Sequence, residues 1–163
     1  MKEISCSFTG HRVIEKDDYY KVMFLLQKIV EEKIKEGYKI FCSGGALGFD
    51  TLAAMTVLKL KETYPDIQLH LYLPCMDQAE KWPKDAQEKY EYIKQQANLI
   101  SYAVQIHTPE CMHQRNRSLI DKSSVCIAYC KQEKGGTAYT VNYAKEKNIP
   151  VINIADMIDN FEF

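Results

Sequence analysis

Residues 38–60 read YKIFCSGGALGFDTLAAMTVLKL. The apolar run Tyr38–Cys42 predicts a buried strand, and the apolar residues from Phe49 to Leu60 recur at helical spacing. A glycine-rich turn, Ser43–Gly48, joins the two. Such a turn leaves backbone N–H groups at the positive end of the helix dipole, where an anion binds. This stretch therefore predicts a strand–helix unit of a parallel sheet with a phosphate site at the end of the strand.

Two more turns of this kind follow predicted strands. Thr9–Arg12 (TGHR) comes after the strand Ile4–Phe8, and Gly135–Thr137 (GGT) comes after the strand Val125–Tyr129. In a parallel sheet the turns after the strands lie at one edge, where ligands bind. The three turns together predict a nucleotide or a phosphate-sugar ligand more firmly than one turn does.

Strands and helices alternate along the chain. Three further strands are predicted over 67–73, 99–104 and 151–154, the second of them weaker than the others. Helices are predicted over 17–36, from 49 to about 60, from Pro83 to 97, from about 112 to 122, and from the GGT turn to 147, with a loop over 74–82. This alternation predicts an α/β fold: a three-layer, doubly wound, mainly parallel and Rossmann-like sheet in a single domain, 1–163.

Size and charge narrow the class of protein. A chain of 163 residues suits one compact domain. The net charge of −1 and the pI of about 6.4 provide no broad basic field, which disfavours nucleic acid as a partner. The N-terminal residues Met1–Ile4 lack the apolar segment of a signal peptide, and the apolar runs are too short to cross a membrane. We expect a cytoplasmic protein.

The cysteines do not indicate a disulfide framework or a metal site. The chain has six cysteines without a CxxC pair, most of them in or beside predicted strands, where a thiol acts as a small apolar group. His107, Cys111 and His113 lack a fourth ligand at a recognisable spacing. We therefore expect no metal.

In the turn Ser43–Gly48, each residue type has a possible role. Gly44 and Gly45 allow the backbone to approach a phosphate, and Ser43 adds a hydroxyl. Asp50, in the first helical turn, either stabilises the helix dipole or accepts a hydrogen bond from a ribose hydroxyl. The spacing is not the dinucleotide GxGxxG pattern.

The TGHR turn places a cation and an imidazole beside the predicted ligand edge. Gly10 belongs to the turn itself, and Arg12 is the stronger candidate for binding an anion. His11 either contacts the ligand or hydrogen-bonds a neighbouring backbone group, which is the somewhat more common role.

The second half of the chain adds further candidates. Arg115 and Asn116 interrupt the apolar edge of a predicted helix, and a guanidinium there either binds phosphate or forms a salt bridge. Gly135, Gly136 and Thr137 open the next helix, where Thr137 also suits the N-cap.

The only tryptophan, Trp82, lies in the loop above the same edge, with Glu80 nearby. Its indole ring either stacks on a base or closes the core beneath the loop, and the sequence favours neither.

Taken together, TGHR, SGGALGFD, the RN pair followed by IDKS, and GGT resemble the SLOG superfamily, a Rossmann-like group that includes the lonely-guy phosphoribohydrolases and DprA. Residues 74–97 and 114–129 look most like its YpsA family, and SGGALGFDTLAA is similar to the corresponding turn of DprA. The resemblance spans nearly the whole chain. It implies a nucleotide or ADP-ribose-like ligand and, from the lonely-guy proteins, a homodimer, and it implies no certain cofactor.

The resemblance also implies that the catalytic glutamate of the lonely-guy enzymes is missing from this chain. Lonely-guy enzymes carry a catalytic glutamate three residues after the threonine of their glycine turn, and Thr140 stands there in this chain, while Arg115 matches their preceding arginine. We therefore expect a ligand-binding sensor or regulator. The alternatives are an N-glycosidic hydrolase that uses Asp50 or Glu80 as its carboxylate, and a DprA-like protein that binds single-stranded DNA.

Overall fold

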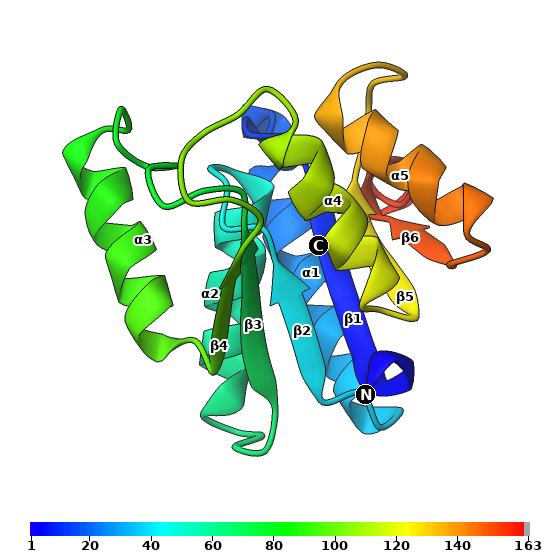
Figure 1. Ribbon diagram of the computed structural model, residues 1–163. Helices are drawn as coiled ribbons and strands as arrows, with labels where there is room; N and C mark the ends of the chain where they lie inside the picture. The colour runs from blue at the N-terminus through cyan, green and yellow to red at the C-terminus, as the bar shows by residue number, and fades with distance from the viewer. Residues whose placement is uncertain (162–163) are drawn as a thin grey trace.

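In a computed structural model, which describes residues 1–161, the chain forms a six-stranded sheet in the order β4-β3-β2-β1-β5-β6 (Figure 1). Every pair of neighbouring strands is parallel. In chain order the strands are β1 (Ser5–Gly10), β2 (Ile40–Ser43), β3 (Gln68–Leu73), β4 (Leu99–Tyr102), β5 (Val125–Tyr129) and β6 (Val151–Asn153).

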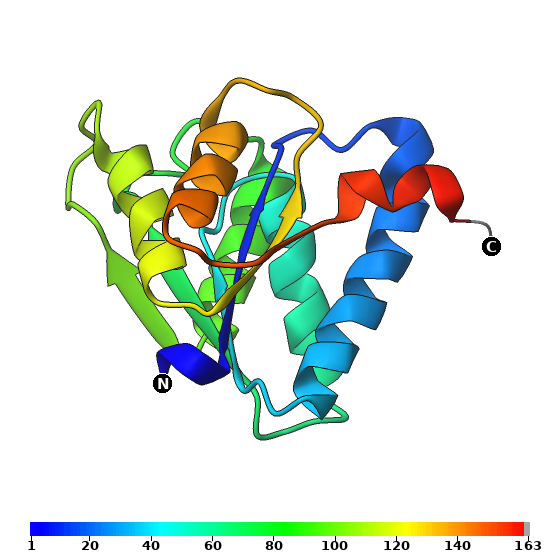
Figure 2. The same cartoon turned by 90° about the vertical axis from the view of Figure 1, so that its right-hand side faces the viewer.

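Helices cover both faces of this sheet. They are α1 (Tyr19–Lys35), α2 (Phe49–Lys61), α3 (Lys84–Gln96), α4 (Cys111–Asp121) and α5 (Gly136–Glu146). Helix α2 packs between α1 and α3 on one face, whereas α4 and α5 pack together on the other (Figure 2). This arrangement confirms the predicted three-layer, doubly wound α/β fold.

The element bounds differ from the predicted ones at several ends. The helix expected from residue 17 begins at Tyr19, because Lys16–Asp18 form a separate 3₁₀ turn. It ends at Lys35, and Gly37 takes a φ of +105°, which suits a glycine after a helix. Strand β4 ends at Tyr102 rather than 104, since it is an edge strand with a single partner, β3. Ends without partners are where local patterns predict least.

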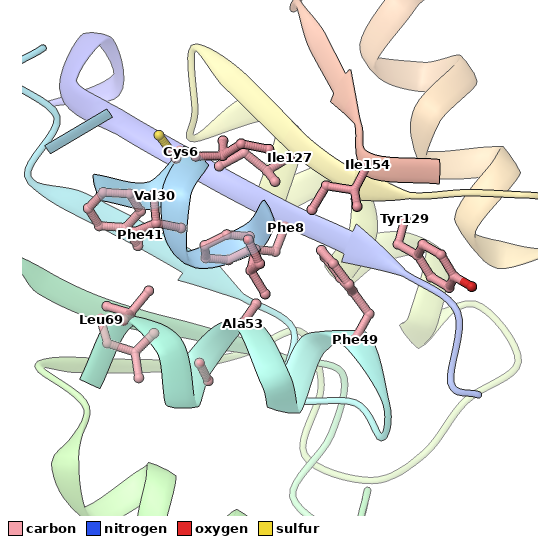
Figure 3. Close-up of a cluster of buried hydrophobic side chains, with 14 of the residues drawn as sticks. Cys6, Phe8, Val30, Phe41, Phe49, Ala53, Leu69, Ile127, Tyr129 and Ile154 are labelled. Carbon is pink, nitrogen blue, oxygen red and sulfur yellow. The ribbon is translucent and has the colours of Figure 1, made fainter. Parts of the chain in front are cut away.

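A row of buried aromatic rings runs along the face of the sheet beneath α1 and α2. Phe41 and Phe8 stack at 6.3 Å, Phe8 meets the edge of Phe49 at 6.4 Å, and Phe49 stacks on Tyr129 at 6.1 Å (Figure 3). The row ends at the last residue of β5, so the apolar core continues to the carboxyl edge of the sheet. That edge is thus built on rigid packing.

The cysteines contribute to this core as single thiols. All six are free, and five of them are buried. Burial raises the pKa of the Cys42 and Cys126 thiols to about 12, so both remain protonated and apolar in character. Among residues 1–161 there is no helix whose length and apolar content would suit a membrane span.

Candidate functional site

The strand order reverses between β1 and β5, and a cavity of about 340 Å³ lies at this point. In doubly wound sheets such a reversal opens a crevice at the carboxyl ends of the strands. The cavity, called the main cavity below, is bounded by four segments: the TGHR segment, the start of α2, the inward face of α4, and the loop from β5 into α5. Thr9 and Gly10 of TGHR are the last two residues of β1 and not part of a turn after it, because both pair with β5. The TGHR segment and the GGT turn therefore meet at one place, and from the stretch Ser43–Asp50 only Ala46 and Asp50 reach it.

The N-terminus of α5 faces the main cavity. Gly135 and Gly136 are exposed there, and a Cβ on either one would meet nothing within 4 Å. No hydrogen bond among residues 1–161 uses the backbone N–H groups of Gly136 or Thr137. The helix begins at Gly136 with Gly135 as its N-cap, so Thr137 lies in the first turn instead of at the predicted cap. Free amides at a helix N-terminus form an anion site.

The turn between β2 and α2 is built differently. Gly44 lies beneath the Arg115 side chain, whose Nη1 donates to the Gly44 carbonyl oxygen, and Gly45 packs against Leu73 and Tyr90. The amide of Gly45 donates to Ser43 Oγ at 3.2 Å. Ser43, Gly44 and Gly45 are buried and do not line the main cavity. The phosphate contact expected from their sequence is replaced there by contacts within the protein.

Asp50 does line the main cavity, although its side chain is only 5% exposed. Its Oδ2 accepts a hydrogen bond from the Ala46 amide at 3.3 Å, while its Oδ1 has no partner among residues 1–161. Burial raises the pKa of Asp50 to about 6, and the positive charges of Arg115 and Arg12 oppose part of that rise. The buried Oδ1 therefore lacks the hydrogen bond that buried carboxylate oxygens usually have.

Arg115 is the buried cation of the site, with 6% of its surface exposed. Besides its bond to Gly44, its Nε donates to Asn116 Oδ1 at 2.7 Å, and its Nη2 lies 3.6 Å from the sulfur of Met112. Burial lowers the pKa of Arg115, and Asp50 opposes that effect. The salt bridge to a helix carboxylate, which was the alternative to phosphate binding, is not present among residues 1–161, where Arg115 is held by neutral oxygens instead. Arg115 thus lines the main cavity with a charge that no contact ion pair neutralises in the described part of the chain.

The TGHR segment supplies one fixed and one free side chain. His11 Nε2 accepts a hydrogen bond from the Lys131 amide at 2.8 Å, and burial lowers its pKa, so the ring stays neutral at pH 7. Arg12 is exposed and has no hydrogen bond or ion pair within residues 1–161. Gly10 is needed because a Cβ there would overlap the Phe49 ring. All three residues line the main cavity.

A polar network that the sequence patterns did not reveal anchors the loop between β5 and α5. The buried Asp18 accepts hydrogen bonds from Tyr129 Oη at 2.8 Å and from Lys131 Nζ at 3.1 Å, and Lys131 also pairs with Glu15 at 2.7 Å. Burial acts to raise the pKa of Asp18, but these hydrogen bonds hold it below its ordinary value. The partners lie far apart in the chain, so only the pairing of Gly10 with Tyr129 across β1 and β5 brings them together.

Two other candidates lie outside the main cavity. Trp82 and Glu80 line a neighbouring cavity of about 490 Å³, which shares Arg12 and Met112 with the main one. Thr9 of the TGHR segment also lines the main cavity, as do three side chains that the sequence did not single out as ligand contacts: His113, Gln132 and Lys134. The position of Lys134 next to the glycines of a helix start is a local signal, although a flanking lysine is more often solvent-exposed, whereas His113 and Gln132 carry no local signal for this cavity.

Comparison with known proteins places this geometry in a family. Residues 8–159 match the YpsA model, described as the YspA SLOG family. The chain belongs to this family. The expected resemblance to SLOG proteins is confirmed, and the match includes the TGHR segment, both later glycine turns and Arg115.

Curated relatives of this SLOG family member are UPF0398 proteins. One from Bacillus cereus (strain B4264) and one from Bacillus thuringiensis (strain Al Hakam) are each 32% identical to the chain over 117 residues. The match covers 70% of the chain and 64% of each relative, so it spans less than two thirds of their length.

Solved structures of DNA processing protein A share the fold. The protein from Helicobacter pylori, reported for its single-stranded DNA binding mode, has a TM-score of 0.68 at 21% identity over 90% of this chain and 63% of its own. DprA from Streptococcus pneumoniae has a TM-score of 0.64 at 17% identity over 99% of this chain and 63% of its own. At these identities the likeness shows the fold alone.

Two positions of the resemblance to the lonely-guy enzymes can be located in the structure. Thr140, which stands where those enzymes carry glutamate, is buried in α5 and donates its hydroxyl to the Gly136 carbonyl at 2.9 Å. Arg115, the matching arginine, lines the main cavity. Asp50 is the carboxylate at the main cavity, and Glu80 lies in the neighbouring one.

Proposed function

We propose that this SLOG family member binds a nucleotide-derived ligand in the main cavity and acts as a sensor or regulator without turning the ligand over. The observation that carries the proposal is the free N-terminus of α5 beside the buried Arg115 and the exposed Arg12. Helix amides, a fixed guanidinium and a flexible guanidinium are the groups that proteins use for phosphate.

The Asp50 carboxylate is suited to bind a sugar beside that phosphate. Its Oδ1 is buried, lacks a partner within residues 1–161, and lies at the same cavity as the cations. An orphaned carboxylate oxygen costs free energy unless a donor reaches it, and a ribose hydroxyl is such a donor. The site thus provides complementary groups for a phosphoribosyl unit.

The proposal is tested by thermal unfolding with a panel of ribose 5-phosphate, AMP, ADP, ADP-ribose, NAD, cyclic nucleotides and an oligo(dT) strand. A ligand at 100 times its Kd stabilises the folded state by about 2.7 kcal/mol, which is a shift in Tm of roughly 5–10 °C for a chain of this size. Absence of a shift with every phosphoribosyl compound would refute the proposal. A shift with oligo(dT) alone would favour the DprA-like alternative.

A matched pair of variants ties binding to the main cavity. Arg12→Gln removes a cation that has no partner in the described part of the chain, so we expect at least tenfold weaker binding with an unchanged Tm of the free protein. Lys28→Gln removes an exposed cation on α1, outside the main cavity, and should leave binding unchanged. Equal effects of the two changes would mean that only net charge matters.

The hydrolase alternative rests on one observation, the raised pKa of Asp50. A carboxyl with a pKa of about 6 can act as a general acid near neutral pH. Chromatography of wild-type protein incubated with nucleoside monophosphates distinguishes the two functions, because release of free base that is lost in Asp50→Asn indicates hydrolysis.

Native mass spectrometry of the purified protein would reveal both a bound ligand and the number of subunits, for which we propose a homodimer.

A further inference from the structure

The neighbouring cavity is formed mainly by the loop between β3 and α3. Residues of 75–82 line it together with His107, and Arg12 and Met112 form its boundary with the main cavity. The main cavity, at about 340 Å³, is at the small end of the roughly 300–1,000 Å³ typical of ligand pockets. A nucleotide whose phosphoribosyl part fills the main cavity would therefore extend its base past Arg12 and Met112.

Trp82 provides an aromatic surface in this second cavity. Its ring is half-buried and makes a T-shaped contact with Tyr90, with centroids 5.1 Å apart and planes at 71°. Tyr90 is itself buried against Gly45, where a Cβ would meet the Tyr90 ring at 3.2 Å. The indole is thus held in place by the core and also lines the cavity, so both roles considered from the sequence are compatible.

Gln78 adds a polar group without a partner. Its Nε2 donates to Tyr90 Oη at 3.2 Å, and its buried Oε1 has no hydrogen bond within residues 1–161. Turning the amide by 180° would pair Oε1 with the tyrosine hydroxyl and leave Nε2 alone, so in either orientation one amide atom lacks a partner. A buried polar atom of this kind is satisfied by a ligand group.

Two carboxylates line the same cavity, and one of them is free. A hydrogen bond from the Cys75 thiol, with further bonds from backbone N–H groups including that of His107, lowers the pKa of Asp77 and holds it in the loop. Glu80 is exposed and has no ion pair within the described residues. In the orientation that leaves Gln78 Oε1 unpaired, Glu80 and Gln78 both offer free acceptors, and these favour a ligand edge that donates hydrogen bonds.

We infer that the second cavity is a nucleobase subsite for an amino-bearing purine, adenine or guanine, which stacks on Trp82 and donates to Glu80 and Gln78. The inference rests on the proposed function, because the phosphoribosyl part must occupy the main cavity for the base to reach this one. Purines are favoured over pyrimidines because their larger ring system stacks over more of the indole.

Calorimetric titration with four probes tests the subsite: ribose 5-phosphate, AMP, GMP, and purine riboside 5′-monophosphate, which is AMP without its amino group. We expect AMP or GMP to bind at least tenfold tighter than ribose 5-phosphate, from stacking and pairing of the base. Removal of the amino group should weaken binding about fivefold.

Variants locate the effect in the second cavity. Glu80→Gln should weaken binding of the tighter of AMP and GMP about fivefold and leave ribose 5-phosphate unchanged, whereas Glu88→Gln, an exposed position on α3 outside this cavity, should change neither. Trp82→Leu should weaken the same nucleotide roughly tenfold, with Trp82→Phe keeping part of the affinity. If Trp82→Leu lowers the Tm of the free protein, the exposed Glu80 still provides the test.

The outcomes separate the two proposals. If AMP, GMP and ribose 5-phosphate bind equally well, or if Glu80→Gln weakens all of them alike, the base subsite is wrong and the phosphoribosyl site stands. If none of the four probes binds, the proposed function fails and the subsite fails with it.

Discussion

The turns that open α2 and α5 share a glycine-rich sequence but use their glycines for different reasons. At α2, a Cβ on Gly44 would overlap the Arg115 guanidinium, and one on Gly48 would overlap the Arg12 carbonyl. At α5, a Cβ on Gly135 or Gly136 would meet nothing within 4 Å. The glycines of the first turn are needed because other parts of the protein pack against them, whereas those of the second face open space at the main cavity. Glycine content alone does not distinguish the two.

The largest expected effect on stability is at the turn Ser43–Gly48, against which other parts of the protein pack. Gly48→Ala places a methyl group against the Arg12 backbone and forces alanine to a φ of +76°, so we expect a loss of more than about 3 kcal/mol in the free energy of unfolding, measured by urea denaturation. Gly37→Ala is the matched control, since Gly37 has a φ of +105° but open space around it. It should cost only about 1 kcal/mol. Equal losses would show that backbone strain, not packing, explains Gly48.

Asp50 lies in the first turn of α2 and lines the main cavity, and its raised pKa makes the stability of the protein depend on pH. Its pKa is about 6 in the folded protein against an ordinary value of 3.8, so its contribution to stability is full below about pH 4 and is lost as the pH rises through 6. This difference corresponds to about 3 kcal/mol. Asp50→Asn should therefore stabilise the protein by up to that amount at pH 7.5 and have little effect at pH 4, measured by urea denaturation.

Asp18 provides the opposite control, because hydrogen bonds lower its pKa. Its contribution is present above its unfolded pKa and is lost as the pH falls through the lower folded one, so Asp18→Asn should destabilise the protein at pH 7.5 and progressively less as the pH falls below about 4. If both variants destabilise the protein at pH 7.5, the assignment of Asp50 as an incompletely satisfied carboxylate is wrong.

A smaller effect on stability is expected from loss of the hydrogen bond between Tyr129 and Asp18, which anchors the loop between β5 and α5. Tyr129→Phe removes the 2.8 Å hydrogen bond to Asp18 but keeps the stack on Phe49, so the free energy of unfolding should fall by about 1–1.5 kcal/mol. Hydrogen exchange should be faster over 130–137 and unchanged in α2. Unchanged exchange in that loop would show that Asp18 does not hold it.

The smallest effect on stability is expected at the turn Gly135–Thr137, which lines the main cavity. Gly136→Ala should leave the free energy of unfolding within about 0.5 kcal/mol of wild type, because the methyl group meets no atom of the protein. The same methyl group projects where the ligand phosphate is proposed to bind, so we expect about tenfold weaker binding of ribose 5-phosphate by calorimetry. Wild-type affinity in this variant would argue against an anion at α5.

Some of the side chains that the sequence singled out lie at the main cavity and others do not. Arg12, Asp50, Arg115 and the GGT turn all line the main cavity, because each follows a strand or interrupts an apolar helix face, and both are local signals. Ser43, Gly44 and Gly45 carried the strongest glycine signal and are buried instead. His11 took the backbone hydrogen bond that was considered somewhat more common.

By itself the sequence determined the order of strands and helices, and with it the edge of the sheet where the turns gather, because hydrophobic periodicity and turn residues act over a few neighbouring positions. Only the tertiary structure decided which of the two glycine-rich turns, before α2 or before α5, other side chains cover. Arg115 covers Gly44 across 71 positions of the chain, and Asp18 reaches Tyr129 across 111. Contacts of that separation depend on the packing of α4 and of β5 against β1, for which the residues near Gly44 or Asp18 carry no local signal.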